Sequence, residues 1–230
     1  MDQLKCTVII PAAGKGKRMK HHQHKQYIEL KGKPILVYTL EAFMRCDAIT
    51  HIIIVVGQGE VDYCKQEIVQ PYSLDKVISV IEGGKERQDS VYEGIKCIPQ
   101  ETDIVLIHDA ARPFIQEEHI ISTIKEANKS GACVLGVKVK DTIKVVNNEG
   151  NIISTPNRDM LWAIQTPQTF KKEIIKEAYE QAIKYKFVAT DDAMVVEKYA
   201  DTTVTIVEGS YGNIKITTQE DLMVANALDL

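Results

Sequence analysis

The sequence predicts an α/β fold in which a mostly parallel sheet carries helices on both faces and a β-hairpin is inserted. Short apolar runs alternate with segments of helical periodicity as far as residue 130, and such alternation is typical of the crossover units that build parallel sheets. Glycines and charged residues collect directly after the apolar runs, at the strand ends where such sheets bind ligands. The stretch 136–155 instead alternates apolar and polar residues around Asn147-Asn148-Glu149-Gly150, which indicates a hairpin.

The first half of the chain divides into elements by its periodicity. Residues 7–10 form a β-branched run that ends at Pro11, which predicts a buried strand followed by a loop. Pro34 suits the first position of a helix over 34–45, whose apolar residues recur on one face. Further strands are predicted at 49–56, 76–81 and 104–107, and further helices at 61–70, 88–97 and 117–130.

The second half begins with the hairpin, which we place at 137–160. Because an isolated two-stranded ribbon is marginal in water, we expect this one to pack on something. Thr190 is expected to cap a helix, and Thr218 opens the last helix with Asp221 three residues on, as in a capping box. The remaining elements are predicted as helices at 171–185 and 190–199 and strands at 204–207 and 214–216. With no internal repeat or long linker, residues 1–230 read as one domain.

Composition excludes several classes of protein. The chain has 230 residues and a formal net charge of −4, which argues against binding nucleic acid through a broad basic face. Five widely spaced cysteines without a Cys-x-x-Cys pair favour reduced thiols over a disulfide framework or a zinc site. The longest apolar run, 52–56, is far too short to cross a bilayer, and the N-terminus lacks a secretory pattern. We therefore expect a cytoplasmic protein without a membrane segment.

The loop after the first strand is strongly basic. Seven Lys or Arg and one acidic residue lie between Lys15 and Lys33. The loop lacks the Walker spacing, and Met19 stands where the dinucleotide fingerprint would have its third glycine. Glycines still let a backbone approach phosphate closely, and a triphosphate needs cations around it. We therefore expect an anion site that includes Arg18 and Lys25, the alternative being a solvated charged loop. The nearby histidines lack a carboxylate or Cys partner at ligand spacing, so we do not expect a metal there.

Two further clusters carry charge to the predicted edge. Asp109 follows the strand 104–107, and a carboxylate there commonly holds Mg²⁺ beside substrate phosphates. Arg112 could pair with it or bind an anion. Lys215 should project from the strand 214–216 away from its apolar neighbours. The simpler alternatives are that Asp109 caps a turn and that Lys215 faces solvent.

Taken together, the motifs resemble those of the 2-C-methyl-D-erythritol 4-phosphate cytidylyltransferase family. The resemblance runs in order from residue 8 to residue 222, and ribitol 5-phosphate cytidylyltransferases share most of it. Ala111 and the segment 157–170 look more like the methylerythritol enzymes. The matching motifs are Pro11-Ala12-Ala13-Gly14-x-Gly-x-Arg18, Lys25-Gln26-Tyr27, Gly83-Gly84-x-x-Arg87-x-x-Ser90-Val91, His108-Asp109-Ala110-Ala111-Arg112-Pro113, Gln165-Thr166-Pro167-Gln168-x-Phe170, Thr190-Asp191-Asp192-Ala193 and Asn213-Ile214-Lys215.

The resemblance implies a Rossmann-like nucleotidyltransferase fold with a seven-stranded core and a protruding arm at 137–160. It implies transfer of CMP from CTP to 2-C-methyl-D-erythritol 4-phosphate, in non-mevalonate isoprenoid precursor synthesis. It also implies Mg²⁺ or another divalent cation and a homodimer joined through the arm. The implied catalytic residues are Arg18, Lys25 and Lys215. The implied nucleotide-binding residues are Ala12, Ala13, Gly14, Gly16, Gly83, Gly84, Ser90 and Ala110. The implied substrate-binding residues are Asp109, which would also sit near the metal, Arg112, and Thr142 and Arg158 on the neighbouring subunit's arm.

Two positions depart from some relatives. Lys85 and Gly212 stand where those relatives carry Asp, which removes a possible metal contact at the second position. A phosphate-monoester nucleophile is already an anion near neutral pH, so no general base is expected. Three rival functions remain open: a ribitol 5-phosphate cytidylyltransferase, a UTP-using sugar-phosphate uridylyltransferase, and a nucleotide-binding regulator that releases no pyrophosphate.

Overall fold

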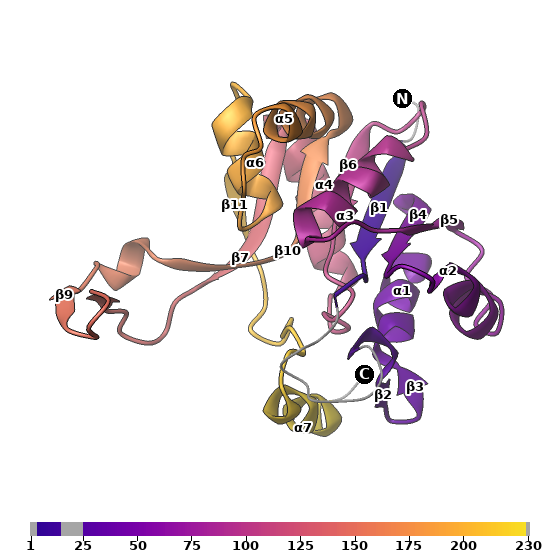
Figure 1. The fold of residues 1–230 in the computed structure, drawn as a ribbon, viewed down its shortest axis with the longest axis horizontal. Coiled ribbons are helices and arrows are strands. Elements are labelled where there is room, and N and C mark those ends of the chain that lie inside the picture. The colour runs from indigo at the N-terminus through magenta and orange to yellow at the C-terminus, as the bar shows by residue number, and fades with distance from the viewer. Residues whose placement is uncertain (1–3, 15–24, 229–230) are drawn as a thin grey trace.

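A seven-stranded sheet forms the centre of the molecule (Figure 1). The computed structural model describes residues 4–14 and 25–228, with Lys25 described through its backbone only. The described strands of the sheet follow the order β11-β7-β10-β6-β1-β4-β5. Their bounds are β1 Cys6–Pro11, β4 Ile49–Val56, β5 Val77–Glu82, β6 Ile104–Ile107, β7 Ala132–Lys138, β10 Trp162–Lys171 and β11 Thr205–Glu208.

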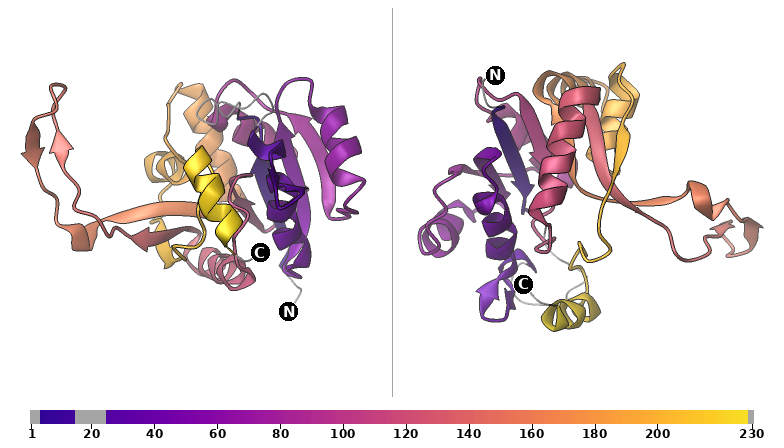
Figure 2. Two further views of the ribbon diagram at one scale, coloured as in Figure 1. Left: turned by 90° about the horizontal axis from the view of Figure 1, so that it is seen from below. Right: turned by 180° about the vertical axis from the view of Figure 1, so that it is seen from behind.

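Helices cover both faces of this sheet (Figures 1 and 2). Strand β1 shows how the two layers arise, because alternate side chains point to opposite faces. Val8 and Ile10 pack into one core with α1 and α4, while Ile9 packs into the other with α3, α5 and α6. The helices are α1 Ile35–Arg45, α2 Val61–Tyr63 with its π-helical continuation Cys64–Val69, α3 Arg87–Lys96, α4 Glu117–Ser130, α5 Lys172–Lys184, α6 Asp192–Tyr199 and α7 Gln219–Ala227.

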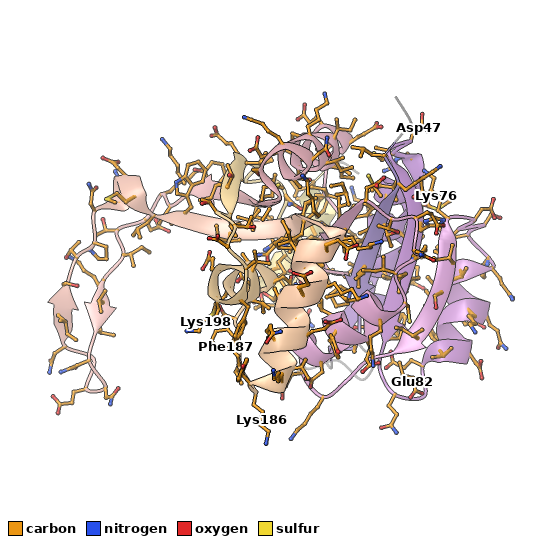
Figure 3. The ribbon with its side chains drawn as sticks, turned by 90° about the horizontal axis from the view of Figure 1, so that it is seen from above. Asp47, Lys76, Glu82, Lys186, Phe187 and Lys198 are labelled. Carbon is orange, nitrogen blue, oxygen red and sulfur yellow. The ribbon has the colours of Figure 1, made fainter. Side chains whose placement is uncertain are left out.

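The carboxyl ends of β1, β4, β5 and β6 share one edge of the sheet, because these strands are adjacent and parallel. Figure 3 shows both edges: Asp47 and Lys76, which precede β4 and β5, lie at one end, and Glu82, the last residue of β5, lies at the other. Strand β10 is antiparallel to both β6 and β7, and it pairs Gln168 with Ile107. The residues that precede Gln168 therefore lie beside those that follow Ile107, at the carboxyl edge.

The hairpin insertion forms an arm that extends away from the sheet (Figures 1 and 2). Its two short strands, β8 Val145–Val146 and β9 Ile152–Ser154, are antiparallel. The turn between them uses Gly150 at a φ of 84° and the Asn147 side chain, which accepts the backbone N–H groups of Glu149 and Asn151. The short helix Arg158–Met160 follows before β10 returns the chain to the sheet. The predicted hairpin is thus confirmed.

Several predicted elements need correction. Strand β10 was not predicted; it is antiparallel to both of its neighbours, within a sheet that is mostly parallel as expected. Residues 214–216 do not form a strand; the Ile216 N–H instead bonds singly to the carbonyl of Ala111. Asp191, rather than Thr190, caps α6 by accepting the Met194 N–H, because its side chain lies nearest the first turn. The prediction of a capping box at the start of α7, from Thr218 and Asp221, is confirmed.

Two smaller features also differ from expectation. Pro34 is the residue before α1 rather than its first residue, because its ψ of 138° is extended. It belongs to an unpredicted hairpin in which β2, Glu29–Leu30, pairs with β3, Lys33–Pro34. Lys31 and Gly32 make the turn at φ values of 50° and 79°. Across the described ranges, no helix combines the length and the apolar character needed to cross a membrane.

Candidate active site

The glycine loop after β5 packs against the loop after β1 and the first turn of α3. A Cβ atom built on Gly83 would lie 2.5 Å from Ser90 Oγ and 3.0 Å from the Cβ of Ala13. A Cβ on Gly84 would lie 2.3 Å from the Cβ of Asp89. Only glycine fits such close approach without rearrangement. The two glycines therefore bring three predicted nucleotide-binding segments together at the carboxyl edge.

Helix α3 begins beside these glycines with a capping box. The Glu86 side chain accepts from the backbone of Asp89, and Asp89 Oδ2 accepts the Glu86 N–H at 3.0 Å. Ser90 is buried and donates from Oγ to the carbonyl of Glu86 at 3.1 Å. This start fixes Arg87 in the first helical turn, with its side chain about two-thirds buried. The described part of the site therefore includes an arginine that the sequence analysis gave no role.

Asp109 is the centre of a charged cluster. Its carboxylate contacts three cations: Lys215 Nζ lies 2.8 Å from Oδ2, Arg112 Nε lies 3.4 Å from Oδ2, and Arg87 Nε lies 3.4 Å from Oδ1. The Asp109 side chain is 10% exposed, whereas that of Lys215 is 35% exposed. Burial by itself would raise the pKa of Asp109, but the charges of Arg87, Lys215 and Arg112 outweigh burial and hold this pKa well below its usual range. Asp109 is therefore ionised at neutral pH.

A buried histidine and threonine fix the backbone of Asp109. The Asp109 N–H donates to Thr166 Oγ1 at 3.1 Å, and the Thr166 hydroxyl lies 3.1 Å from Nδ1 of His108. His108 Nε2 lies 3.1 Å from the carbonyl of Arg112, and since a carbonyl only accepts, this nitrogen carries the proton. Burial lowers the pKa of His108 to about 4, so the ring is neutral near pH 7 and is buried away from any substrate. It acts here as a structural bridge.

The segment before α7 carries Lys215 to Asp109. Asn213 donates from Nδ2 to the carbonyl of Thr166 at 3.0 Å and accepts at its own carbonyl from Arg112 Nη1 at 2.7 Å. The Ile216 N–H donates to the carbonyl of Ala111 at 2.9 Å. These bonds hold both sides of Lys215 against the loop after β6. The side chain of Lys215 is therefore directed by these hydrogen bonds of the connecting segment, and not by the alternation of a strand.

The predicted site residues fall into three groups. Ten lie in the segments that meet at the carboxyl edge: Ala12, Ala13, Gly14, Gly83, Gly84, Ser90, Asp109, Ala110, Arg112 and Lys215. Thr142 and Arg158 are exposed and belong to the arm at 137–160, which extends away from the sheet (Figure 2). Gly16 and Arg18 lie outside the described residues, as do His21, His22 and His24, and so does the side chain of Lys25.

Arg87 and Asp192 were missed as site residues. The guanidinium of Arg87 binds Asp192 through two nitrogens, at 3.0 and 2.7 Å, as well as contacting Asp109. Both residues stand inside motifs quoted above, so a signal was present in the sequence. The sequence did not reveal that these two residues pair. The predicted helix over 88–97 excluded Arg87, and the predicted helix starting at Thr190 placed Asp192 in its first turn.

The donor set suits a cation that arrives with phosphate better than one held by protein alone. In the ranges 4–14 and 25–228, no group of three or more His, Cys, Asp or Glu side chains is placed to hold a metal. Asp109 offers one carboxylate, and Mg²⁺ commonly binds one or two carboxylates together with substrate phosphates. Asn213, whose backbone carbonyl accepts from Arg112, also has a buried Oδ1 atom without a hydrogen-bond partner. One carboxylate with a substrate triphosphate therefore fits Mg²⁺.

The two departures from some relatives lie beside this cluster. Lys85 is exposed on the glycine loop. The Gly212 N–H bonds to Ser210 Oγ at 3.0 Å, in the turn that leads into Asn213. Gly212 therefore offers no side-chain oxygen to a metal at this position.

Comparison with known proteins identifies the family of this chain. The family model described as IspD, 2-C-methyl-D-erythritol 4-phosphate cytidylyltransferase, matches residues 6–228. A curated relative of that name from Alkaliphilus oremlandii is 51% identical over 224 residues, which cover 97% of this chain and 94% of the relative. A second, from Clostridium botulinum, is 47% identical with 97% of both chains covered.

Solved structures agree with the sequence comparison. The crystal structure of 4-diphosphocytidyl-2C-methyl-D-erythritol synthase from Anaerococcus prevotii has a TM-score of 0.86 at 38% identity, covering 98% of this chain and 96% of its own. The 2-C-methyl-D-erythritol 4-phosphate cytidylyltransferase of Francisella tularensis has a TM-score of 0.82 at 32% identity, covering 97% and 99%. These neighbours confirm the α/β nucleotidyltransferase fold.

Proposed function

The chain belongs to the 2-C-methyl-D-erythritol 4-phosphate cytidylyltransferase family, and we propose that it transfers CMP from CTP to 2-C-methyl-D-erythritol 4-phosphate. The products are 4-diphosphocytidyl-2-C-methyl-D-erythritol and pyrophosphate, in the synthesis of isoprenoid precursors by the non-mevalonate route. The observation that carries this function is the Asp109 carboxylate with its three cations beside the Gly83–Gly84 loop. The similar proteins carry the methylerythritol name, which favours this substrate over ribitol 5-phosphate.

The reaction is an electrostatic problem. A phosphate-monoester oxygen of the substrate attacks the α-phosphorus of CTP, a new P–O bond forms, and the bond to pyrophosphate breaks. Two anions must meet, and charge builds on the phosphoryl oxygens and on the leaving group. Catalysis therefore depends on positioning and on preorganised cations. Lys215 is suited to this work because it already lies at the cluster and is partly exposed.

No general base is needed, because the nucleophile is already ionised near neutral pH. The described site agrees with this chemistry. His108 is buried, neutral near pH 7 and hydrogen-bonded at both ring nitrogens. Asp109 is ionised and surrounded by cations, which makes it a poor proton acceptor. Its role is to orient Lys215 and Arg112 around the reacting phosphates.

The nucleotide is proposed to lie along the loops after β1 and β5. The backbone of 12–14, the paired glycines Gly83 and Gly84, and buried Ser90 would surround the cytidine, with Ala110 at the base of the site. Gly16, Arg18 and Lys25 would follow along the triphosphate, by the resemblance of the opening loop. Arg112 would contact the incoming polyol phosphate. The cytosine amino group could then donate to backbone carbonyls, which would favour CTP over UTP.

Mg²⁺, or another divalent cation, is proposed as the cofactor. Asp109 would hold it together with triphosphate oxygens, and when bound it would neutralise charge on the phosphates. Lys215 Nζ lies 2.8 Å from Asp109 Oδ2. Because Arg87 and Arg112 also contact this carboxylate, Lys215 would be able to turn from it toward a phosphate of the bound nucleotide.

We propose that the arm at 137–160 joins two copies of the chain and that the arm of each copy completes the site of the other. The arm carries apolar side chains that one chain leaves in water: Ile152 is 63% exposed, Ile153 65% and Met160 79%. Such a ribbon is marginal alone, and exposed apolar surface of this kind marks an interface. Arg158 Nη1 bonds to the carbonyl of Lys140 at 2.8 Å, which fixes the cation at the root of the arm. Thr142 and Arg158 would bind the substrate phosphate of the partner's site.

Subunit mixing tests this arrangement. An Arg18→Ala chain and an Arg158→Ala chain should each form inactive homodimers. In a heterodimer with arms acting across the interface, one site combines both defects and the other is wild-type at both positions, so activity returns on mixing. Arms acting within their own chain leave one defect in every site. Inactivity after verified subunit exchange, or a monomeric wild type by sedimentation, would remove the composite site.

We infer a cytoplasmic location from the cysteines. Cys6, Cys46, Cys64 and Cys133 are buried thiols and Cys97 is exposed. Burial raises the pKa of Cys6, Cys64 and Cys133 to about 12, which keeps these thiols protonated and unreactive. Such an arrangement suits a reducing compartment.

The function is tested by measuring pyrophosphate release from CTP with 2-C-methyl-D-erythritol 4-phosphate and, separately, with ribitol 5-phosphate. Release with the methylerythritol substrate, at a kcat/KM at least about 100-fold above that with ribitol 5-phosphate, is expected. Equal or reversed preference would assign the chain to the ribitol reaction. CTP binding without release with either substrate would make it a nucleotide-binding regulator.

A further inference from the structure

Arg87 joins two carboxylates that come from distant parts of the chain. Its Nη1 and Nη2 atoms donate to the two oxygens of Asp192 at 3.0 and 2.7 Å. Its Nε atom lies 3.4 Å from Asp109 Oδ1. The contact with Asp192 is a two-point fork, which fixes the plane of the guanidinium, while the contact with Asp109 is a single longer one. The orientation of Arg87 toward Asp109 is therefore set by Asp192.

Asp192 is itself held firmly. Its side chain is fully buried, and Tyr179 donates to its Oδ1 at 2.6 Å. The Asp192 and Ala193 N–H groups donate to Oε1 of Gln168 at 3.0 and 2.9 Å. Gln168 belongs to β10 and pairs with Ile107 of β6, two residues before Asp109. The chain Tyr179–Asp192–Arg87–Asp109 thus leads from helix α5, through the buried Asp192 and the partly buried Arg87, to the carboxyl edge of the sheet.

The other partners of Asp109 are held differently. The Lys215 side chain is about as exposed as that of Arg87, at 35% against 31%, but it contacts the carboxylate through one ammonium group. An ammonium has no fork geometry and turns readily to another anion. Arg112 is anchored to the carbonyl of Asn213 at 2.7 Å but touches Asp109 only at 3.4 Å. Among these cations, Arg87 alone is locked to a second, buried carboxylate.

We propose that Arg87 is a positioning residue for CMP transfer: Asp192 fixes its guanidinium, and the guanidinium keeps the Asp109 carboxylate in place when Lys215 turns to the incoming triphosphate. The proposal rests on the proposed function. Arg87 is the fixed counter-ion of Asp109, and Lys215 is the exchangeable one. Asp192 acts on the reaction only through Arg87, because it lies in a different element and its side chain is fully buried.

The test compares Arg87→Met, Arg87→Lys, Asp192→Asn and the double variant Arg87→Met/Asp192→Asn. Arg45→Met and Asp75→Asn serve as controls, because both residues are exposed near the opposite edge of the sheet. For each protein, kcat and KM are measured for both substrates. The rise in melting temperature with CTP alone gives a second readout that does not depend on turnover.

Arg87→Met is expected to lower kcat about 10- to 100-fold, which lies within the coupling measured between residues in contact, while the CTP-dependent rise in melting temperature is retained. Arg87→Lys should stay impaired at least about 5-fold, since an ammonium keeps the charge but cannot make the fork. The double variant should match Arg87→Met in kcat within about 2-fold, because Asp192 has no separate route to the reaction. It should also melt higher than Arg87→Met, which leaves Asp192 buried and unpaired.

Three results would overturn the proposal. Unchanged kcat in both Arg87 variants at a lowered melting temperature would make Arg87 purely structural. Loss of the CTP-dependent rise with normal kcat at saturating CTP would make it a direct nucleotide contact. A loss of kcat in the double variant equal to the product of the losses in the two single variants would give Asp192 an independent role. If Arg87→Met does not fold, Arg87→Lys and the double variant decide. A wild type that turns over normally separates all of these from failure of the proposed function.

Discussion

Lys215 Nζ lies 2.8 Å from Oδ2 of Asp109, although Lys215 stands on the segment before α7 and Asp109 follows β6. This pair brings a partly exposed cation to a buried, ionised carboxylate at the edge where the loops after β1 and β5 meet. Asp109 keeps Arg87 and Arg112 as further partners. Lys215 can therefore leave Asp109 for a phosphate without stranding a buried charge.

Replacing Lys215 with Met should lower kcat by about 100-fold or more, since loss of one preorganised group in a site costs roughly 3 kcal/mol of transition-state stabilisation. The melting temperature should change by no more than a few degrees, because the pair is partly exposed. Steady-state pyrophosphate release and thermal unfolding provide the two measurements. Lys125→Met, an exposed lysine on α4, is the matched control. A Lys215 variant with normal turnover would remove this residue from the mechanism.

Arg18→Ala and Lys25→Ala should each abolish most turnover and leave the fold intact. Both residues follow the Gly14 loop, where a triphosphate is proposed to lie, and each would stabilise charge on the leaving pyrophosphate. Circular dichroism and turnover measured on the same samples separate folding from catalysis. Near-normal turnover in either variant would show that the residue is an ordinary solvated charge.

CTP should be used in preference to UTP. The cytosine amino group can donate to backbone carbonyls near Ala12 and Gly84, whereas the uracil oxygen would face those carbonyls with a second acceptor and leave them unpaired. The discrimination is measured as the ratio of kcat/KM values, and at least about 100-fold is expected. Equal use of the two nucleotides would place the base elsewhere.

Acid should destabilise the fold through His108. The pKa of this ring is lowered by burial from its ordinary value of 6.5 to about 4. Between these values the unfolded chain takes up a proton that the folded chain does not, so the free energy of unfolding falls as pH drops from 6.5 toward 4. The total loss is about 3 kcal/mol. Above pH 6.5 this contribution is constant.

Urea unfolding at pH 7 and pH 5 measures this effect in the wild type and in His108→Gln. The variant should be less stable at pH 7, because two hydrogen bonds are disturbed, but its stability should fall less between the two pH values. An equal fall in the free energy of unfolding between pH 7 and pH 5 in both proteins would mean that His108 is protonated in the folded state at pH 5.

Much of the fold could be predicted from the sequence because periodicity and burial agree there. The strands β4 and β6 and the helix α4 have the predicted bounds, since each is bracketed by clear turn or capping residues. Strand β10 could not be found in this way. Pro167 interrupts its pattern, and its polar residues, such as Gln168, face the site rather than solvent. A strand that builds a site lacks the apolar alternation by which strands are recognised.

The site was predictable where one loop carries its own signal. Residues that directly follow an apolar run could be recognised as candidates. These are the glycines after β1 and β5 and the acidic residue after β6. The pairing of Arg87 with Asp192 depends on where α3 and α6 begin and on how β10 holds Gln168. Lys215 does lie at the carboxyl edge beside Asp109, but not because of a strand: residues 214–216 belong to a connecting segment held by Asn213 and Ile216.

The most direct measurement follows the phosphorus atoms of CTP. The enzyme is incubated with 2-C-methyl-D-erythritol 4-phosphate and either α-labelled or γ-labelled CTP, and the products are separated. The proposed attack at the α-phosphorus predicts that the α label appears in the diphosphocytidyl product and the γ label in pyrophosphate, one for one. Transfer of the γ label to the polyol, or release of labelled phosphate without a cytidylyl product, would contradict CMP transfer at the Asp109–Lys215 site.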